Sequence, residues 1–153
     1  MMTDDRAPVF IDTNVLLRFA IRGAPQHREN REAIQRLWAA GMDLWISRQI
    51  LREFASVLTR PQSYAPPLTS AEAVAELRVI QGRFLIADET AVVTEQLIAL
   101  LEAVPVGGKQ VHDANIVATM RAYGIGQLLT LNAADFRRFT PLIAILAPEE
   151  VLR

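Results

Sequence analysis

The chain has 153 residues, of which 51% are hydrophobic and 22% are charged, and its formal net charge is −1. These proportions exclude an intrinsically disordered chain, and the length suits one domain that buries about two thirds of its unfolded surface. We therefore expect a single globular domain over residues 1–153. The sequence contains no cysteine, which excludes disulfides and thiolate metal sites.

Two features of the sequence predict the compartment of the protein, and the predominance of arginine over lysine is weak evidence about its binding partner. Residues 1–6 have neither the basic start nor the apolar run of a signal peptide, and no apolar segment is long enough to span a membrane. We therefore expect a cytoplasmic protein without membrane association. Lys109 is the only lysine among 16 basic residues. Arginine suits phosphate contacts, but a GC-rich genome explains this bias more simply.

The first half of the chain alternates short apolar runs with amphipathic segments. Val9, Phe10 and Ile11 form a run typical of a strand buried on both faces. In chain order, we then predict a helix over 15–21, a helix from 25 until Gly41, a strand over 44–46, a helix capped by Ser47 and ending near 58, and a proline-rich loop over 60–67.

The second half continues the alternation. In chain order, we predict a helix from 69 or 70 through 80, a strand over 84–86, a helix over 89–103, a helix over 111–123, a strand over 127–131, a turn over 132–135, a helical turn over 136–139 and a strand over 141–146. Strands that alternate with helices indicate βαβ units. The predicted fold is therefore a three-layer α/β/α arrangement around a central, mostly parallel sheet of four or five strands.

Asp12 lies where the first predicted strand ends, and Thr13 and Asn14, which favour helix starts, follow it. Because Asp is disfavoured inside a buried strand, this segment predicts a strand, a turn and a helix, with a carboxylate at the turn. In open α/β sheets, ligands bind at the carboxyl ends of the strands. Other acids that are placed at the same edge of the sheet would therefore converge on Asp12.

Three further acids occupy comparable positions. Glu53 shares a helix face with Ile50 and Val57, where an unpaired carboxylate is unfavourable. Asp113 lies in the first turn of its predicted helix, where the helix dipole alone would favour an acid, and Asp135 follows the strand over 127–131. Mutual repulsion among such carboxylates predicts a divalent cation, and Mg²⁺ or Mn²⁺ suits oxygen ligands better than zinc.

Four segments resemble, in order, the motifs of PIN-domain nucleases, and most closely those of the VapC-type toxins of bacterial toxin–antitoxin pairs. They are Phe10 to Leu17, Ser47 to Phe54, His112 to Ala118 and Leu129 to Phe136. The resemblance runs through nearly the whole chain. Four motifs in the same order are far more specific than any one of them.

This resemblance implies a PIN-like fold and a metal-dependent endoribonuclease that hydrolyses RNA phosphodiester bonds with Mg²⁺ or Mn²⁺. It also implies the toxin of a type II toxin–antitoxin system, with RNA as substrate and a cognate antitoxin and a second copy of the chain, as a homodimer, as partners. The implied catalytic and metal-binding acids are Asp12, Glu53, Asp113 and Asp135. Many relatives have an acid at the place of Asn132, so either Asn132 or Asp135 would supply the fourth ligand.

Neutral and basic residues near these acids are expected to support them. Thr13, Asn14, Thr130 and Asn132 are candidates for contacts to the acids or to phosphate. Helix capping explains Thr13 equally well, and a turn explains Thr130 equally well. Because an acidic site cannot attract a polyanion unaided, arginines are expected to hold the RNA backbone, although a solvated helix face is the simpler explanation for any single one. The candidates are Arg48, Arg52, Arg137 and Arg138.

Two other functions account for parts of the sequence. A receiver-like domain that accepts a phosphoryl group also uses acids at strand ends with magnesium, but it needs a lysine in the pocket, and Lys109 is poorly placed after a Gly-Gly loop. A nonenzymatic PIN-fold scaffold with a degraded metal site would account for Asn132. The presence of Asp12, Glu53 and Asp113 argues against the scaffold.

Overall fold

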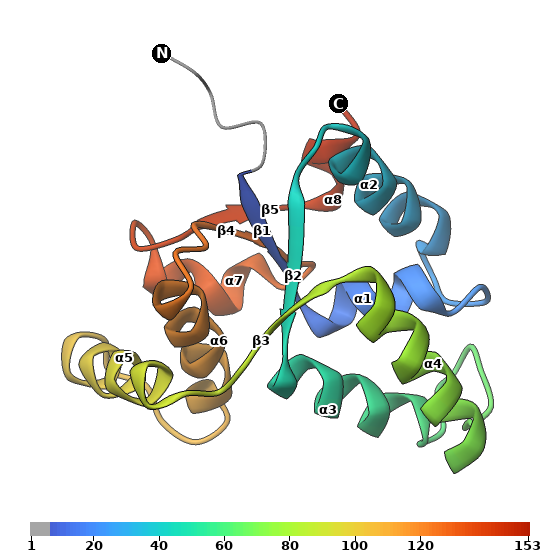
Figure 1. Cartoon of the computed structure of the whole chain (residues 1–153), viewed down its shortest axis with the longest axis horizontal. Coiled ribbons are helices and arrows are strands. Elements are labelled where there is room, and N and C mark those ends of the chain that lie inside the picture. Colours follow the sequence, from blue (N-terminus) through green and yellow to red (C-terminus); the bar gives the residue numbers. More distant parts are fainter. Residues whose placement is uncertain (1–6) are drawn as a thin grey trace.

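The structure is a computed structural model that describes residues 7–153. Residues 1–6, on which the expectation about a signal peptide depends, lie outside the described residues. The strands are β1 (Pro8–Ile11), β2 (Asp43–Ser47), β3 (Leu85–Ala87), β4 (Gln127–Leu129) and β5 (Ala144–Leu146). They form one sheet in the order β3-β2-β1-β4-β5 in which every neighbouring pair is parallel (Figure 1).

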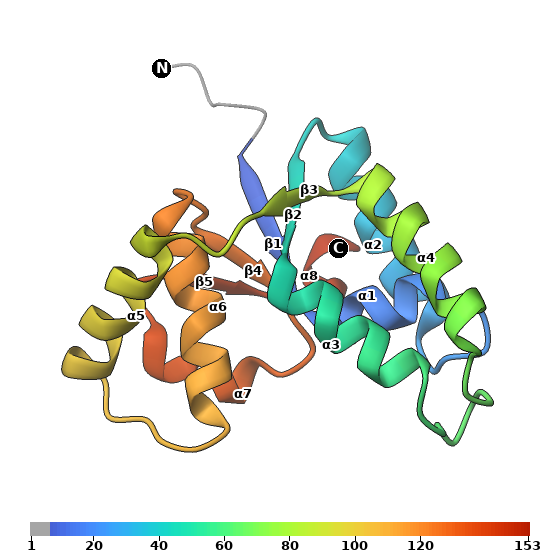
Figure 2. The same cartoon turned by 60° about the horizontal axis from the view of Figure 1, so that its bottom comes forward.

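The helices cover both faces of this sheet. They are α1 (Thr13–Ala20), α2 (His27–Ala39), α3 (Arg48–Leu58), α4 (Ser70–Arg83), α5 (Ala91–Ala103), α6 (Gln110–Ala122), α7 (Ala133–Phe136) and α8 (Pro148–Val151), with a 3₁₀ helix η1 (Arg137–Phe139). In Figure 2, α1 to α4 lie on one side of the sheet and α5 to α7 on the other. Right-handed crossovers produce this division, because the chain moves outward from β1 to β3 and then returns to β4 on the far side of β1. The predicted three-layer α/β/α fold is confirmed.

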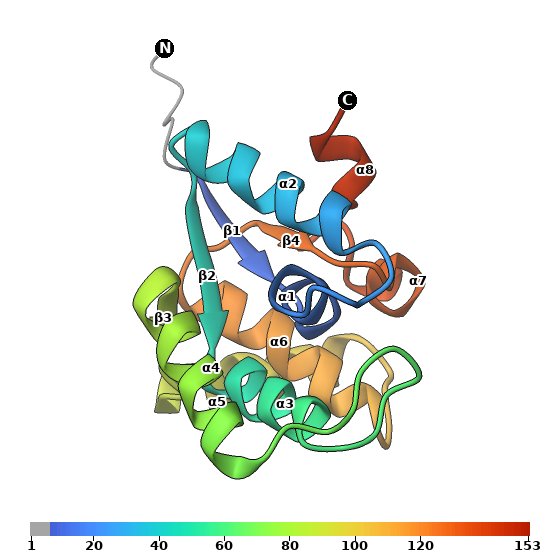
Figure 3. The same cartoon turned by 90° about the vertical axis from the view of Figure 1, so that its right-hand side faces the viewer.

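β1 is the central strand, and its carboxyl end is the point where the strand order reverses. The predicted strand residues Val9, Phe10 and Ile11 are completely buried. Beyond the strand, the Asp12 amide still donates to the Leu129 carbonyl at 3.0 Å, and α1 starts directly at this end of β1 (Figure 3). Reversal points of open α/β sheets are where ligands bind. The fold therefore places Asp12 at the expected position for a site.

The predicted Ser47 cap is confirmed, and Thr69 forms a second cap at the start of α4. The Ser47 hydroxyl accepts a hydrogen bond from the Ile50 amide at 3.3 Å, and it fixes the start of α3. The Thr69 hydroxyl accepts from the Glu72 amide at 3.2 Å, and the Glu72 carboxylate accepts from the Thr69 amide at 3.0 Å. This reciprocal pair satisfies two amides that a helix start otherwise leaves without partners.

Several boundaries near the carboxyl terminus differ from the prediction. β4 ends at Leu129 rather than 131, and α7 replaces most of the turn expected over 132–135. β5 begins at Ala144 rather than at 141, because Pro141 has no amide hydrogen and the Leu142 amide donates to Phe139 in a turn. The four-residue helix α8, which packs beside α2, was not predicted.

Within residues 7–153, none of the helices combines the length and the apolar character that crossing a bilayer requires.

Candidate active site

A pocket of about 260 Å³ lies at the carboxyl ends of β1 and β4. Its lining includes all four acids that the sequence singles out, which are Asp12, Glu53, Asp113 and Asp135. They come from the junction of β1 and α1, from α3, from the first turn of α6 and from α7. The predicted convergence of acids that are far apart in the chain is therefore present in the structure.

Asp12 is buried, and three neutral groups donate hydrogen bonds to its carboxylate. The Thr13 amide donates to Oδ1 at 2.8 Å, and the Thr130 hydroxyl and the Asn14 side-chain amide donate to Oδ2 at 2.7 and 3.2 Å. Burial raises the pKa of Asp12, the three hydrogen bonds oppose that shift, and the negative charge of Glu53 adds to it. A cation in the pocket would therefore stabilise the ionised form of Asp12.

Glu53 is partly buried and each of its carboxylate oxygens has a donor. The Thr13 hydroxyl donates to Oε2 at 2.7 Å, and the Gln49 side-chain amide donates to Oε1 at 3.0 Å. Thr13 therefore joins the two acids, because its backbone binds Asp12 and its side chain binds Glu53. Thr13 begins α1 and also contacts both acids. Its role at the helix start and its role in supporting the acids therefore do not exclude each other.

Asp113 carries the clearest electrostatic sign of crowding. Its pKa is raised to about 6, first by partial burial and then by the negative charges of Asp12, Asp135 and Glu53, while Arg138 acts in the opposite direction. Helix dipole stabilisation alone would lower this pKa rather than raise it. The position of Asp113 in the first helical turn is therefore insufficient to explain its environment.

Asn14, Thr130 and Asn132 connect the acids to the end of β4. The Asn14 side chain donates to Asp12 and accepts from the Leu131 amide at 3.1 Å. The Thr130 hydroxyl donates to Asp12 and accepts from the Asn132 amide at 3.0 Å. Asn132 and Asp135 both line the pocket. The predicted supporting residues thus lie at the site, and both candidates for the fourth ligand remain beside it.

The donor set fits a hard divalent cation in its chemistry and charge. Four carboxylates face one pocket, and their mutual repulsion is visible in the raised pKa of Asp113. Within residues 7–153, no three carboxylate or imidazole groups lie close enough together to hold one ion. Mg²⁺ is usually bound through one or two carboxylates and keeps several waters. One or two of Asp12, Glu53, Asp113 and Asp135 would hold such an ion directly, and the others would reach it through its waters.

The four predicted RNA-binding arginines are distributed differently. Arg48 forms an ion pair with Asp88 at 2.9 Å, and Arg52 forms one with Glu89 at 3.3 Å. Both pairs are exposed, and exposed pairs contribute little free energy, so phosphate can compete for these arginines. Arg137 and Arg138 are exposed on η1, and Arg138 is close enough to lower the pKa of Asp113.

A second hollow of about 450 Å³ adjoins the acid pocket, and Thr13, Glu53 and Val57 line both. Its other lining residues are Arg52, Ser56 and Arg60. These three recur every four residues along α3 and just beyond it, and so they lie on one side of the helix. We call this hollow the α3 groove. Sequence reasoning missed Arg60, although its spacing from Arg52 was a usable signal.

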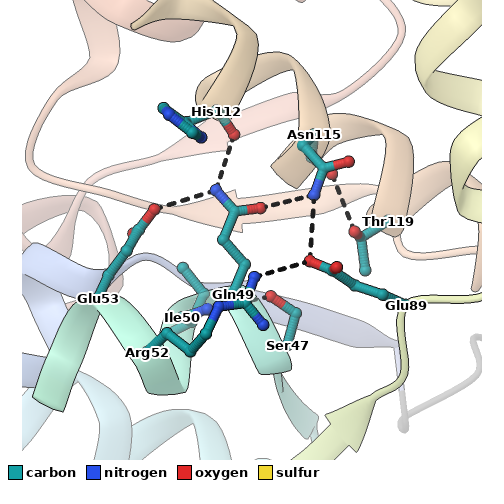
Figure 4. Close-up of polar contacts among 9 residues, drawn as sticks. All are labelled: Ser47, Gln49, Ile50, Arg52, Glu53, Glu89, His112, Asn115 and Thr119. Carbon is teal, nitrogen blue, oxygen red and sulfur yellow. Dashed lines mark hydrogen bonds and ion pairs between the residues drawn. The ribbon is translucent and has the colours of Figure 1, made fainter.

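A polar network beside Glu53 was also missed. Gln49 joins Glu53 to α6, where it contacts the His112 carbonyl and the Asn115 side chain (Figure 4). Its position four residues before Glu53 places both side chains on the same face of α3, which was the only signal in the sequence.

Lys109 does not serve the acid pocket. It is exposed just before α6 and is absent from the residues that line the pocket. A receiver-like site requires a lysine beside its acids, so this alternative is not supported.

Comparison with known proteins agrees with this geometry. The family model described as PIN domain matches residues 9–140. The chain is 26% identical to the ribonuclease VapC24 of Mycobacterium tuberculosis over 132 residues, which cover 84% of this chain and 89% of the relative.

Solved structures of the same fold include a toxin–antitoxin complex from Klebsiella pneumoniae, with a TM-score of 0.64, 22% identity and coverage of 92% of this chain and 97% of that one. Another is VapC20 of Mycobacterium tuberculosis, described as a sarcin–ricin loop cleaving toxin, with a TM-score of 0.57, 24% identity and coverage of 78% and 86%. Because the family model spans most of the chain and includes all four pocket acids, the protein belongs to the PIN domain family.

Proposed function

We propose that this protein is a metal-dependent endoribonuclease that hydrolyses RNA phosphodiester bonds with Mg²⁺ or Mn²⁺. The observation that carries the proposal is the meeting of Asp12, Glu53, Asp113 and Asp135 around one pocket at the carboxyl ends of β1 and β4. The relative VapC24, which is named a ribonuclease, supports RNA as the substrate.

The residues of the pocket divide into ligands and residues that fix their orientation. Asp12, Glu53, Asp113 and one of Asn132 or Asp135 would hold the cation, directly or through its waters. Bound divalent ions supply Lewis acidity at the scissile phosphate and ease the ionisation of the attacking water. Thr13 orients the Glu53 carboxylate through a direct hydrogen bond. Asn14 and Thr130 do the same for the Asp12 carboxylate.

The RNA backbone runs along the α3 groove in this proposal. Arg52 and Arg60 line the groove on either side of Ser56, and the groove opens directly beside Glu53. Guanidinium groups bind phosphate through paired hydrogen bonds. Arg138 and its neighbour Arg137 would contact the strand on the other side of the pocket.

The proposed biological setting is that of a type II toxin. The structural neighbour from Klebsiella pneumoniae is a toxin–antitoxin complex, which supports a cognate antitoxin as partner. The proposal also includes a homodimer and a cytoplasmic location, both of which are expected of toxins of this type.

Metal binding and cleavage test the proposal together. Purified protein is titrated with Mn²⁺ by calorimetry and incubated with total RNA in the presence of Mg²⁺, Mn²⁺ or EDTA. Wild type should bind Mn²⁺ and cleave RNA only with a divalent ion, whereas Asp12→Asn and Asp113→Asn should lose both properties. Glu102→Gln, which changes an exposed acid on α5, is the matched control and should behave as wild type.

A nonenzymatic scaffold predicts a different result. Mn²⁺ binding no stronger in wild type than in Asp12→Asn, together with intact RNA, would favour the scaffold and refute the nuclease.

A further inference from the structure

Gln49 is the most thoroughly bound polar side chain next to the acid pocket. It is 5% exposed, on the face of α3 that packs toward α6. Its amide nitrogen donates to Glu53 Oε1 at 3.0 Å and to the His112 carbonyl at 2.9 Å. Its amide oxygen accepts from the Asn115 amide at 2.8 Å. Both hydrogens and the oxygen of the amide are therefore used.

These partners permit only one orientation of the Gln49 amide. Turning it by 180° would direct its oxygen at the Glu53 carboxylate and the His112 carbonyl, which are both acceptors, and would lose both hydrogen bonds in a buried place. The surrounding atoms thus keep two N–H groups aimed at Glu53 and at α6. A glutamate in the same position would have no hydrogen to donate in its ionised form.

The consequence for Glu53 is a carboxylate fixed at both oxygens. Gln49 holds Oε1 from one turn earlier on α3, and Thr13 holds Oε2 from the start of α1. Since the second bond of Gln49 ends on the backbone carbonyl of His112, the same amide links Glu53 to the residue that precedes Asp113. The link spans α3 and α6 (Figure 4).

An outer set of residues keeps Gln49 in place. Asn115, which donates to the Gln49 oxygen, also contacts Glu89 at 3.4 Å. Glu89 in turn pairs with Arg52 at 3.3 Å, which returns the network to α3. The network is thus anchored to α3, to α6 and to the segment before α5.

We propose that Gln49 is a positioning residue that sets the orientation of the Glu53 carboxylate and its distance from Asp113, and that it thereby prepares the pocket to bind its cation. This inference rests on the proposed nuclease function. Gln49 contacts no substrate in this proposal and acts only through Glu53 and the start of α6.

The test replaces Gln49 by methionine, which has a similar length and volume but no hydrogen-bonding amide. Mn²⁺ affinity, measured by calorimetry on the protein without RNA, should weaken by about 10- to 100-fold, the usual effect of removing a partner that orients a metal ligand. In cleavage assays at saturating Mn²⁺, kcat should fall while KM for RNA stays within about twofold, because RNA contacts are unchanged. Gln49→Asn, which keeps the amide but is one methylene shorter, should show the same loss and serves if the methionine variant does not fold.

Ser47→Ala is the matched control for a merely structural role. It weakens the start of the same helix but leaves the contacts of Glu53 in place. This variant should lose stability while keeping Mn²⁺ affinity and kcat near the wild-type values.

The outcomes separate the two proposals. If wild type binds Mn²⁺ and cleaves RNA and both folded Gln49 variants match it, the positioning role is refuted and the nuclease stands. If Ser47→Ala loses affinity as much as Gln49→Met does, the effect is general destabilisation and the positioning role is again refuted. If wild type neither binds Mn²⁺ nor cleaves RNA, the nuclease proposal fails, and the positioning role fails with it.

Discussion

Thr130 and Asp12 are 118 residues apart in the chain, and the Thr130 hydroxyl donates a 2.7 Å hydrogen bond to the Asp12 carboxylate. Both side chains are buried at the carboxyl ends of neighbouring parallel strands. The bond compensates in part for the burial that raises the pKa of Asp12. It therefore stabilises the ionised form of Asp12 in the metal-free protein.

Removing this hydroxyl should destabilise the protein. Thr130→Val keeps the shape of the side chain but leaves the buried Asp12 carboxylate with one donor fewer, and we expect a loss of about 1–3 kcal/mol in the free energy of unfolding. Urea denaturation at pH 7 without metal measures it. Thr119→Val is the matched control, because Thr119 is equally buried but donates to the Asn115 carbonyl, and a loss as large as that of Thr130→Val would contradict the argument.

The raised pKa of Asp113 predicts how stability depends on pH. Because its pKa is about 6 in the folded state and near 3.8 otherwise, the folded protein binds more protons between these values. Ionised Asp113 therefore destabilises the metal-free fold above pH 6, and this loss is regained progressively as the pH falls from about 6 toward 3.8. Asp12, whose pKa is also raised, acts in the same direction.

The measurement compares the melting temperatures of metal-free wild type and Asp113→Asn at pH 5 and pH 7.5. Asp113→Asn should be the more stable of the two at pH 7.5, and this advantage should shrink at pH 5. An advantage of equal size at both pH values would show that ionisation of Asp113 is not the cause. Mg²⁺ should remove the advantage at pH 7.5 by stabilising wild type alone.

The α3 groove predicts a specific salt dependence. In an Asp12→Asn background that binds but does not cleave, Arg52→Gln and Arg60→Gln should each weaken RNA binding. Each should also make the slope of log K against log salt concentration shallower by about 0.7, the value for one phosphate contact on a single strand. Arg28→Gln, on α2 and outside the groove, should leave the slope unchanged. Unchanged slopes for Arg52 and Arg60 would place the RNA elsewhere.

The fourth ligand can be assigned by paired substitutions. If Asp135 holds the cation, Asp135→Asn should weaken Mn²⁺ binding by roughly tenfold, because affinity depends on the number of charged ligands. If residue 132 lies closer to the cation than Asp135 does, Asn132→Asp should tighten Mn²⁺ binding by a similar factor. Calorimetry on both variants decides between the two positions, and no change in either would exclude both.

The cap of α3 predicts a purely structural effect. Ser47→Ala removes the acceptor for the Ile50 amide, and helix caps of this kind contribute about 1 kcal/mol. Thermal and urea denaturation should report that loss. A neutral effect would indicate that the buried Ile50 amide finds another partner.

The sequence was sufficient to predict the convergence of the acids because each one is tied to a local signal. Asp12 ends a fully apolar run, and Asp113 begins a helix, so the parallel sheet alone brings them together. Gln49 had no comparable signal, because two of its partners, His112 and Asn115, are 63 and 66 residues away. Nothing in the local sequence distinguishes a glutamine with such partners from a solvated one.

Element boundaries were least predictable where tertiary contacts override local preference. Leu131 was expected to extend β4, but its amide donates to the Asn14 side chain instead of to a neighbouring strand. The apolar residues after Pro141 predict a strand that begins at 141. Because proline has no amide hydrogen to donate, the paired strand begins only at Ala144. The deviation at Leu131 lies beside the pocket, because its partner Asn14 lines it. The deviation at Pro141 precedes β5, which is the neighbour of β4 in the sheet.

The bond between Thr130 and Asp12 has a further consequence during synthesis on the ribosome. The growing polypeptide emerges from its amino terminus, so Asp12 leaves the exit tunnel long before Thr130 and Asp135 have been translated. Until those residues arrive, Asp12 lacks its hydroxyl donor and the pocket lacks one wall. If the protein is the proposed nuclease, a nascent chain therefore lacks a complete active site until Thr130 and Asp135 have been translated and have left the tunnel.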